Sequence, residues 1–447
     1  MKWHGAAVVT PEPAHGNLLR VRRACKFLLR PTAKQAAALA ACLEDHRQLY
    51  NAALEHRRIA WQKAAVTVRY GDQSADLRHI RCYDPGGQGR WSFSSQQATL
   101  RRLDKAFAAF FRRVKAGQKP GYPRFKGYGW FDTVEWPEDG DGCRWDCAPG
   151  SGQVRLRLQG IGQVKVRQHR PVRGTIKTIS VKREGRRWYV ILSCDGVPAE
   201  PLPSTGAIIG IDMGITYFMT TSDGAHVPNP HYLAMSAARL ADGQRTLSRC
   251  KRRSMRRKKA RERVASVRRK VRRQRLDFAH KTALTLVRDH DLIAREALRI
   301  GNMTRSARGT IGIPGTNVAA KSGLNRSILD AGWGVFLTVL RAKAESAGRV
   351  VVEVDPRHTS QTCSQCGHIA AENRVSQSLF RCLACGHSAH ADVNAAQNIL
   401  RAGLARQAAS NAAREACGTS RGSSHVSAAL QRTVPARARG SRSGRPG

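Results

Sequence analysis

The chain has 447 residues, enough for two to four domains, and its apolar fraction of 41% can form a sizeable core. Lys and Arg number 77 against 32 Asp and Glu, and a net charge of +45 favours a polyanionic partner, nucleic acid above all. A membrane or secreted protein is disfavoured, because no apolar run approaches the ~20 residues of a span and the N-terminus lacks a signal-peptide core.

The N-terminal part is predicted to combine one strand with helices. Residues 1–21 are expected to be a leader, and the alternation over 22–30 predicts a strand. Helical spacing follows from 33 to about 65, and a second helix is predicted over 94–115. The Gly-rich segment 84–89 between them reads as a loop.

Residues 120–200 change to short alternating runs. These predict a small antiparallel β-barrel or sheet with strands over 153–158, 162–167, 175–183 and 187–192, and a linker at 198–203. Just before them, the segment 118–126 interleaves cations with aromatic residues. Tyr122 and Phe125 could stack on bases while Lys119, Arg124 and Lys126 meet phosphates, although both rings could equally be core residues.

A different domain is predicted from about residue 206. Its expected elements are strands 207–212 and 217–222, a basic helix pair over 231–288, strand 291–296, a Gly-rich loop 301–324, helix 326–347, strand 349–354 and helix 392–403. Residues 404–447 have few large apolar groups and are expected to be a disordered basic tail.

The stretch 251–281 holds sixteen Lys or Arg and two acids. Valines at helical spacing give it one packed edge, and a merely solvated helix would mix charge signs more evenly. We therefore predict contact with a nucleic-acid backbone by Arg252, Arg253, Arg256, Arg257, Arg268 and Arg272.

Three acids stand where an RNase H-like nuclease needs them. Asp212 and Glu296 each end an apolar strand, and Asp392 opens the last helix. Any one of them could be a surface acid or a helix cap. Their joint order predicts a cluster that holds two divalent metal ions, one to activate the attacking water and one to stabilise the leaving oxygen.

Four of the twelve cysteines form two Cys-x-x-Cys pairs, Cys363 with Cys366 and Cys382 with Cys385. Each pair precedes Gly-His, so each can make a tight turn toward one structural Zn²⁺. The other eight are scattered, which is typical of a reducing cytoplasm rather than of a disulfide scaffold.

Several ordered motifs resemble the TnpB family, the RNA-guided nucleases of IS200/IS605- and IS607-type transposons, which are related to compact type V CRISPR effectors. The resemblance covers residues 25–402 and is carried by Gly210-Ile-Asp-Met-Gly-Ile215, Asp277-Phe-Ala-His-Lys281, Glu296-Ala-Leu298, Ser327-Ile-Leu-Asp-Ala-Gly-Trp-Gly334, Thr359-Ser-Gln-Thr-Cys-Ser-Gln-Cys-Gly367 and Asp392-Val-Asn-Ala-Ala-Gln-Asn398.

The resemblance implies an α/β multidomain fold: a RuvC (RNase H-like) nuclease domain with an inserted zinc ribbon, and an N-terminal β-barrel wedge domain interrupted by a helical recognition domain. The implied boundaries are 22–32 and 119–203 for the wedge, 33–118 for the recognition domain, 204–358 and 389–403 for RuvC, and 359–388 for the ribbon.

The resemblance also implies partners and cofactors. These are a guide RNA, target double-stranded DNA next to a short adjacent motif, two Mg²⁺ ions that Mn²⁺ can replace, and one Zn²⁺. Tyr70, Ser74 and Gln97 are expected to contact the adjacent motif. A monomer in the prokaryotic cytoplasm, close to the nucleoid, is expected.

The same pattern is compatible with other functions. A miniature type V CRISPR effector would have the same centre, and only the neighbouring DNA would distinguish it. An RNA-guided repressor without cleavage would have lost the acids, which are all present. A strand-joining transposase would end its acidic series in Glu rather than Asp392, and a non-catalytic zinc-ribbon factor would not need the acidic trio.

Overall fold

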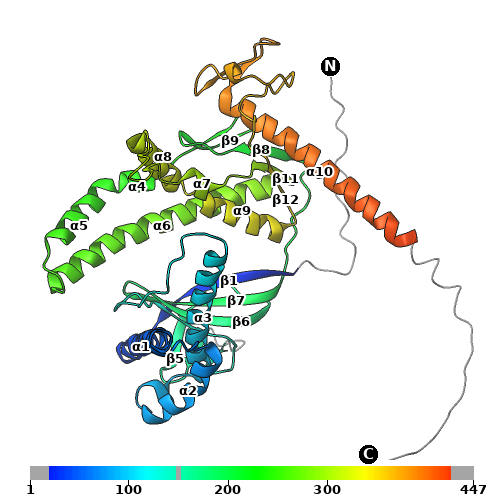
Figure 1. Ribbon diagram of the computed structural model, residues 1–447. Helices are drawn as coiled ribbons and strands as arrows, with labels where there is room; N and C mark the ends of the chain where they lie inside the picture. Colours follow the sequence, from blue (N-terminus) through cyan, green and yellow to red (C-terminus); the bar gives the residue numbers. More distant parts are fainter. Residues whose placement is uncertain (1–19, 147–152, 424–447) are drawn as a thin grey trace, which may run out of the picture. The chain divides into compact units, whose positions relative to one another are not determined.

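The computed structural model describes residues 20–146 and 153–423 (Figure 1). Most of the predicted leader and the tail beyond Ser423 lie outside the described residues. Contacts divide the chain into two compact units, Met1–Glu200 with Ala238–Lys270, and Pro201–Ala237 with Val271–Gly447. No helix of the described part is long and apolar enough to cross a bilayer.

The first unit contains a seven-stranded antiparallel sheet. Its order is β2 (Thr133–Trp136), β6 (Thr175–Glu184), β7 (Arg187–Pro198), β1 (Arg20–Arg30), β5 (Gly162–Arg167), β4 (Arg155–Leu158) and β3 (Cys143–Asp146). The two edge strands are consecutive in the chain and only residues 137–142 separate them, so the sheet curls into a nearly closed barrel. The predicted strands are confirmed; β2 and β3, four residues each, were missed.

Helices fill the connection between β1 and β2. They are α1 (Ala33–Ala64), α2 (Tyr70–Tyr83), the short 3₁₀ turn η1 (Gln88–Arg90) and α3 (Phe93–Lys115). A capping box fixes the start of α1, since Thr32 and Gln35 exchange side-chain to backbone hydrogen bonds. The sequence did not reveal α2, which buries only Gln73 and Leu77 and so carries a weak amphipathic pattern.

The basic helix pair is confirmed as α5 (Ala237–Arg249) and α6 (Met255–Asp289), preceded by the short α4 (Tyr232–Met235). Val264 and Val271 are buried, as the predicted packed edge requires. Gly243 of α5 lies close to Val264 of α6, which leaves the cationic side chains on the remaining faces.

The second unit contains a five-stranded mixed sheet. Its order is β10 (His226–Pro228), β9 (Tyr217–Thr221), β8 (Ile208–Asp212), β11 (Leu292–Glu296) and β12 (Val350–Val354). Strands β8, β11 and β12 are parallel, whereas β9 and β10 run antiparallel to their neighbours. Both faces are covered, which explains the near-continuous apolar strands.

Helices on the two faces use alternate residues of the same strands. Ile209, Ile211 and Ile293 pack with α6, α8 (Val318–Ala331) and α9 (Trp333–Ala347). Leu292 and Ala294 belong to the cluster on the other face, beneath α10 (Ala391–Ser423). Figure 1 shows α10 running across the sheet.

Three expectations for this unit are wrong. The helix predicted over 326–347 is two helices, because Gly332 takes φ 76° and ends α8 before α9 begins. The predicted loop 301–324 contains α7 (Ile300–Met303) and the start of α8. The predicted disordered tail is helical to Ser423, since Ala-rich sequence after residue 404 has high helix propensity.

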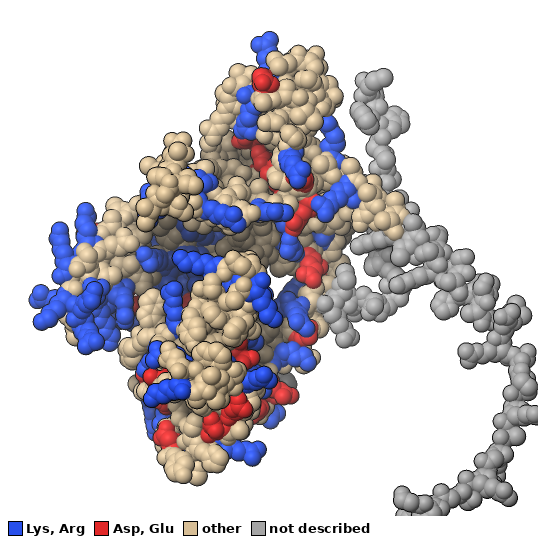
Figure 2. All heavy atoms as spheres, viewed as in Figure 1, with Lys and Arg blue, Asp and Glu red and all other residues tan. Residues whose placement is uncertain are grey.

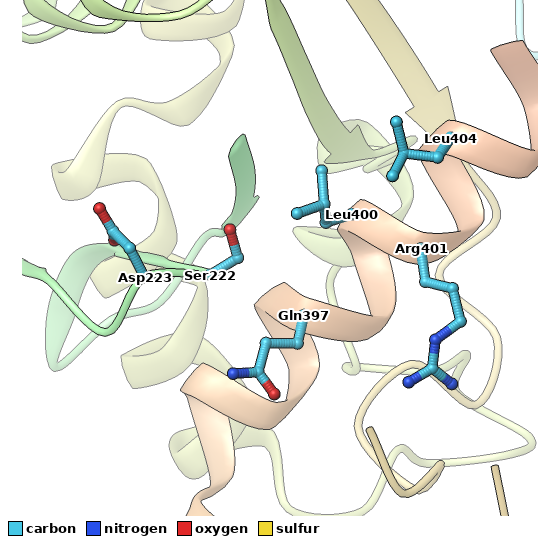
Figure 3. Close-up of a pocket in the computed structure, with 6 residues that line it drawn as sticks. All are labelled: Ser222, Asp223, Gln397, Leu400, Arg401 and Leu404. Atoms are coloured by element: carbon cyan, nitrogen blue, oxygen red, sulfur yellow. The ribbon is translucent and has the colours of Figure 1, made fainter. Parts of the chain in front are cut away.

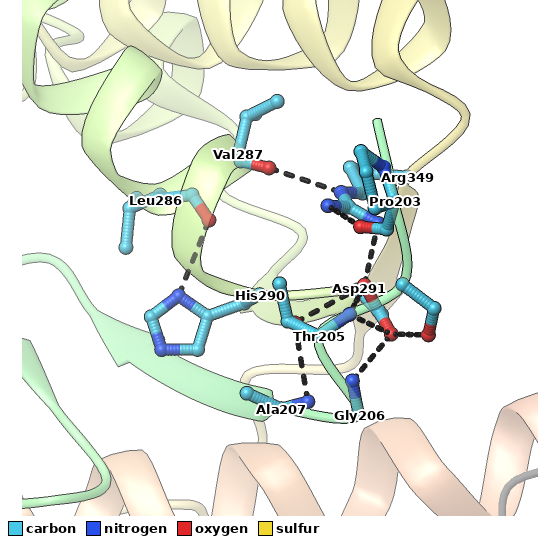
Figure 4. Close-up of polar contacts among 10 residues, drawn as sticks. Pro203, Thr205, Gly206, Ala207, Leu286, Val287, His290, Asp291 and Arg349 are labelled. Carbon is cyan, nitrogen blue, oxygen red and sulfur yellow. Dashed lines mark hydrogen bonds and ion pairs between the residues drawn. The ribbon is translucent and has the colours of Figure 1, made fainter. Parts of the chain in front are cut away.

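The N-terminal ends of β8, β11 and β12 are tied together by Asp291 (Figure 4). Its carboxylate accepts hydrogen bonds from Ser204 Oγ and from the backbone N–H groups of Thr205 (3.0 Å) and Gly206 (2.8 Å). Arg349 pairs with the same carboxylate and also donates to Pro203 O at 2.8 Å. This cluster fixes the parallel strands at the end opposite Asp212 and Glu296.

Candidate active site and zinc centre

Asp212 and Glu296 lie at the same edge and on the same face of the parallel sheet. They are the last residues of β8 and β11, which pair in register with Arg295 beside Ile211. Because side chains alternate along a strand, Asp212 shares the face of Gly210, and Glu296 that of Ala294. This is the face that α10 covers.

The third acid arrives on α10, which opens with Ala391 and Asp392. The helix lies directly on β8 at Gly210: a Cβ there would be 2.2 Å from the Ala396 carbonyl oxygen and 2.8 Å from Leu400 Cβ. Glycine within a strand typically marks such a close approach of another backbone. The contact brings the start of α10 to the strand end that carries Asp212.

The electrostatics of Asp212 reflect this convergence. Burial, together with the negative charges of Glu296 and Asp392, raises the pKa of Asp212 to about 7. Burial also raises the pKa of Glu296. The three acids are therefore close enough to repel one another, and a bound cation would relieve that repulsion.

Two neighbours that were not predicted as site residues contact the acids. Thr359 Oγ1 donates a hydrogen bond to Glu296 Oε1 at 2.6 Å. Arg374 Nη2 lies 3.3 Å from Asp392 Oδ1, and its positive charge lowers the pKa of Asp212 against the larger effect of burial. Both residues lie in the cysteine-rich segment 359–388, so this segment contributes to the geometry of the acidic site.

Within the described residues, the four predicted cysteines are the only group of three or more His, Cys, Asp or Glu whose ligand atoms all lie within 4.8 Å of one another. At least one pair of the three carboxylates is therefore more than 4.8 Å apart. Cys363 Sγ lies 3.7 Å from Cys385 Sγ, and Cys366 Sγ lies 3.5 Å from Cys382 Sγ. Four sulfurs at ~2.3 Å from one Zn²⁺ would be ~3.8 Å apart, so the donor set fits structural zinc.

The two cysteine pairs form the same turn twice. In the first, Cys363 N–H donates to His368 O and Gly367 N–H to Cys363 O; in the second, Cys382 N–H donates to His387 O and Gly386 N–H to Cys382 O. Gly367 and Gly386 have φ values of 79° and 73°, a conformation that favours glycine. This explains the glycine after each pair. The following histidines contribute backbone oxygens to these turns.

Three buried asparagines hold this segment in place. Asn373 donates to Gln361 O and accepts from Leu383 N–H, and so joins the two turns. Asn394 and Asn398 of α10 both donate to Thr362 O, at 2.8 and 2.6 Å. Asn398 also donates to Thr359 O at 2.9 Å, which places the Thr359 hydroxyl beside Glu296. Strands β13 (Leu379–Arg381) and β14 (Ser388–His390), with the 3₁₀ turn η2 (Ala371–Asn373), complete the segment.

A cluster of rings also stands beside the acids. Tyr217 and His226 stack at 4.4 Å between ring centroids, and His390 lies 4.8 Å from His226. His226 Nδ1 hydrogen-bonds Thr220, the cross-strand partner of Asp212. The cluster was not predicted from the sequence, since its members come from three separate strands.

Tyr70, Ser74 and Gln97, the predicted contacts to an adjacent motif, come together on α2 and α3. Gln97 Nε2 donates to Ser74 Oγ at 3.0 Å. Tyr70 is partly buried and packs against the hydrophobic core of the first unit. The Arg101 guanidinium lies 5.3 Å from the centroid of its ring. These residues form one polar and aromatic surface, while their role as DNA contacts stays a prediction.

The predicted aromatic and basic segment 118–126 is largely exposed. Tyr122 and Phe125 are each 45% exposed, so neither is a core residue, although Tyr122 packs edge-on against Phe107. Lys119 and Arg124 are exposed. Lys126 is held by Asn51, which exchanges hydrogen bonds with its backbone N–H and O.

Figure 2 shows Lys and Arg side chains crowding the hairpin of α5 and α6, at the left of the view. Five of the predicted contacts there are exposed: Arg252, Arg253, Arg256, Arg268 and Arg272. The sixth, Arg257, instead donates to Leu247 O at 2.8 Å and Cys250 O at 3.2 Å, and so caps the end of α5.

Two pockets lie away from the acids. One, lined by Ser222, Asp223, Gln397, Leu400, Arg401 and Leu404, adjoins the contact of α10 with β8 and contains no predicted site residue (Figure 3). The other lies on the barrel and gathers Arg30, Arg167, Arg186 and Arg187, none of which the sequence singled out. Cross-strand pairing brings Arg30 of β1, Arg167 of β5 and Arg187 of β7 together, and Arg186 lies in the turn just before β7.

Three family models match the chain: "Helix-turn-helix domain" of the IS605 OrfB type over residues 21–65, "Probable transposase" of the IS605 OrfB type over 178–307, and "Cas12f1-like, TNB domain" over 333–399. Over 21–65 the structure has strand β1 and the single helix α1.

Full-length relatives extend this match. "Putative RNA-guided DNA endonuclease InsQ" of Escherichia coli K12 is 33% identical over 86% of the chain and 92% of its own length. A "Putative RNA-guided DNA endonuclease" of Streptomyces pristinaespiralis is 33% identical over 87% of the chain and 91% of its length. The solved "Structure of the mini-RNA-guided endonuclease CRISPR-Cas_phi3" aligns with 87% of the chain and 93% of its own length at 10% identity, with a TM-score of 0.44. On the family models and the two relatives, the chain belongs to the IS605 OrfB/TnpB family, which is related to Cas12f.

Proposed function

We propose that this protein is an RNA-guided DNA endonuclease that cuts target DNA by metal-dependent phosphodiester hydrolysis. The observation that carries the proposal is the convergence of Asp212, Glu296 and Asp392 at one edge of the five-stranded mixed sheet. Family membership supports it, since two relatives that carry the name "Putative RNA-guided DNA endonuclease" match almost end to end. The retained acids favour a nuclease over a repressor without cleavage.

The acidic cluster fits divalent metal. Its donors are carboxylate oxygens, which Mg²⁺ and Mn²⁺ prefer. Burial, and after it repulsion from Glu296 and Asp392, raises the pKa of Asp212, and a bound cation would relieve that repulsion. Asp212, Glu296 and Asp392 would hold two ions. When bound, such ions activate a water and stabilise the leaving oxygen of the cut strand.

The remaining residues of the site position these acids. The Thr359 hydroxyl fixes one oxygen of Glu296, and Asn398 holds the Thr359 backbone in turn. Arg374 contributes a positive charge at Asp392, where a phosphate would approach. Zn²⁺ bound by the four cysteines would keep the cysteine-rich segment folded.

The cationic surfaces would hold the nucleic acids. The exposed arginines of α5 and α6 and the four arginines of the barrel pocket suit RNA and DNA backbones, whereas guide–target pairing would read the target sequence. The surface of Tyr70, Ser74 and Gln97 would read a short motif beside the target.

The test compares Asp212→Ala with Asp289→Ala, an exposed acid at the end of α6. Both proteins are purified with copurifying RNA, which is sequenced to design the target. Asp212→Ala should keep RNA and DNA binding but lose cutting, while the control cuts like the wild type. Measurable cutting by Asp212→Ala, or no RNA-dependent cutting by the wild type with Mg²⁺ or Mn²⁺, would refute the proposal.

A further inference from the structure

The connection between α7 and α8 presents two isoleucines to solvent. Ile311 is fully exposed and Ile313 is 78% exposed, and Pro314 follows them. Side chains of this size are favoured inside a protein or against a partner, because exposing them orders water around apolar surface. Two such side chains on one loop tip indicate a surface whose burial against a partner would be energetically favourable.

The tip is a built turn. Thr310 N–H donates to Ile313 O, and Gly315 N–H donates to Arg308 O, both at 2.9 Å. Gly309 has φ 67°, and a Cβ on Gly315 would lie 1.5 Å from Ala307 O, so both glycines are required by the turn. The isoleucines are therefore presented in a fixed shape, which lowers the entropic cost of inserting them into a partner.

The base of the loop is anchored as well. Lys321 Nζ of α8 donates to Met303 O of α7 at 2.6 Å. Asn325 donates to the carbonyl oxygens of Thr304 and Arg305 at 3.1 Å. These bonds tie the loop to the two helices that flank it.

The charge of the segment indicates the partner. Residues 297–329 contain no Asp or Glu but five cations, Arg299, Arg305, Arg308, Lys321 and Arg326. The loop therefore has apolar side chains at its tip and only positive charges near its base. A suitable partner is a polymer with negative charge on its outer surface and apolar surfaces between its stacked units. Nucleic acid has this character, and isoleucine and proline are among the side chains that insert between base steps.

The loop also starts at the right place. It follows β11, whose last residue is Glu296, so its base departs from the sheet edge that carries the acids. We propose that the Ile311–Pro314 tip inserts between stacked bases of the target DNA and holds its strands apart beside the cutting site. The inference rests on the proposed function and deepens it, because one site can reach each strand only after the duplex is opened.

The test uses Ile311→Ser/Ile313→Ser in the full chain with its guide RNA. Met235→Ser is the matched control, since Met235 is also 78% exposed and lies in the same unit. Cutting is measured on a fully paired target and on one with mismatches that open the segment to be cut. The double variant should cut the paired target about tenfold or more slowly and the opened target at the wild-type rate.

A second readout does not depend on cutting. In the Asp212→Ala background, 2-aminopurine in the opened segment should fluoresce with the native tip and stay quenched with the double variant. Equal losses on both targets would show a cover over the acids instead of a wedge, and no loss on either would also overturn the inference. So would a change in oligomeric mass, which would show that the tip docks a second copy. A wild type that cuts neither target would instead locate the failure in the proposed function.

Discussion

The sharpest consequence of the structure concerns Gly210, which has no chemistry of its own. Replacing it with alanine would place a Cβ 2.2 Å from the Ala396 carbonyl oxygen. An ordinary contact needs about 3.4 Å, so α10 must move away by about 1 Å. The obstacle is helix backbone and cannot rotate aside as a side chain would.

This displacement separates Asp392 from Asp212 and Glu296. Overpacking of this kind costs about 1–3 kcal/mol in the free energy of unfolding. The catalytic cost should be larger, because a misplacement of about 1 Å at a reacting centre lowers the rate by about 100-fold. Gly210→Ala should therefore bind RNA and target normally, melt a few degrees lower and cut about 100-fold more slowly.

Cutting is measured under single-turnover conditions, with binding and melting temperature followed in parallel. Gly323→Ala in α8 is the matched control, since nothing lies within 4 Å of the added Cβ and alanine suits a helix interior. It should cut at the wild-type rate. Wild-type cutting by Gly210→Ala would show that the seating of α10 on β8 does not set the position of Asp392, and the reasoning would fail.

Three other outcomes are expected. Cys363→Ser should lower the zinc content measured by mass spectrometry and the folded yield; normal zinc and melting would contradict a structural centre. Arg374→Ala should slow cutting about 10- to 100-fold at unchanged DNA binding, with partial recovery in Arg374→Lys, because charge at Asp392 is lost. Burial raises the pKa of Asp291, but hydrogen bonds from Ser204, Thr205 and Gly206 outweigh it and lower that pKa from 3.8 to about 2. The stabilisation, about 1–2 kcal/mol after solvent screening, is full above pH 3.8 and lost as pH falls toward 2; urea titrations should show this loss in the wild type and not in Asp291→Asn.

Elements with a strong periodic pattern were predictable from the sequence. Strands β8 and β11 are buried on both faces and read as short apolar runs, and α6 shows valines at helical spacing. The errors fall where the pattern is weak: α2 buries two side chains, and β2 and β3 have four residues each. Gly332 was visible but ambiguous, since a glycine inside a helical pattern is often tolerated and only its φ of 76° shows a break.

The residues of the candidate site were likewise predictable only where they lie in a recognisable pattern. The sequence could reveal Asp212, Glu296 and Asp392 because each lies at the end of a recognisable element, and the cysteines because their spacing sets their geometry. It could not reveal the contacts that Thr359 and Arg374 make with the acids, since their partners lie 63 and 18 residues away in the chain.

These two residues nevertheless link the cysteine-rich segment 359–388 to the acids. Asn398 of α10 holds the Thr359 backbone, Thr359 holds Glu296, and Arg374 meets Asp392 at the start of the same helix. A chain of hydrogen bonds of this kind transmits position only while each member is fixed. Loss of the four-cysteine centre should therefore displace Glu296 and Asp392 and reduce cutting even where the sheet stays folded. The cysteine-rich segment thus determines the geometry of the site as well as its stability.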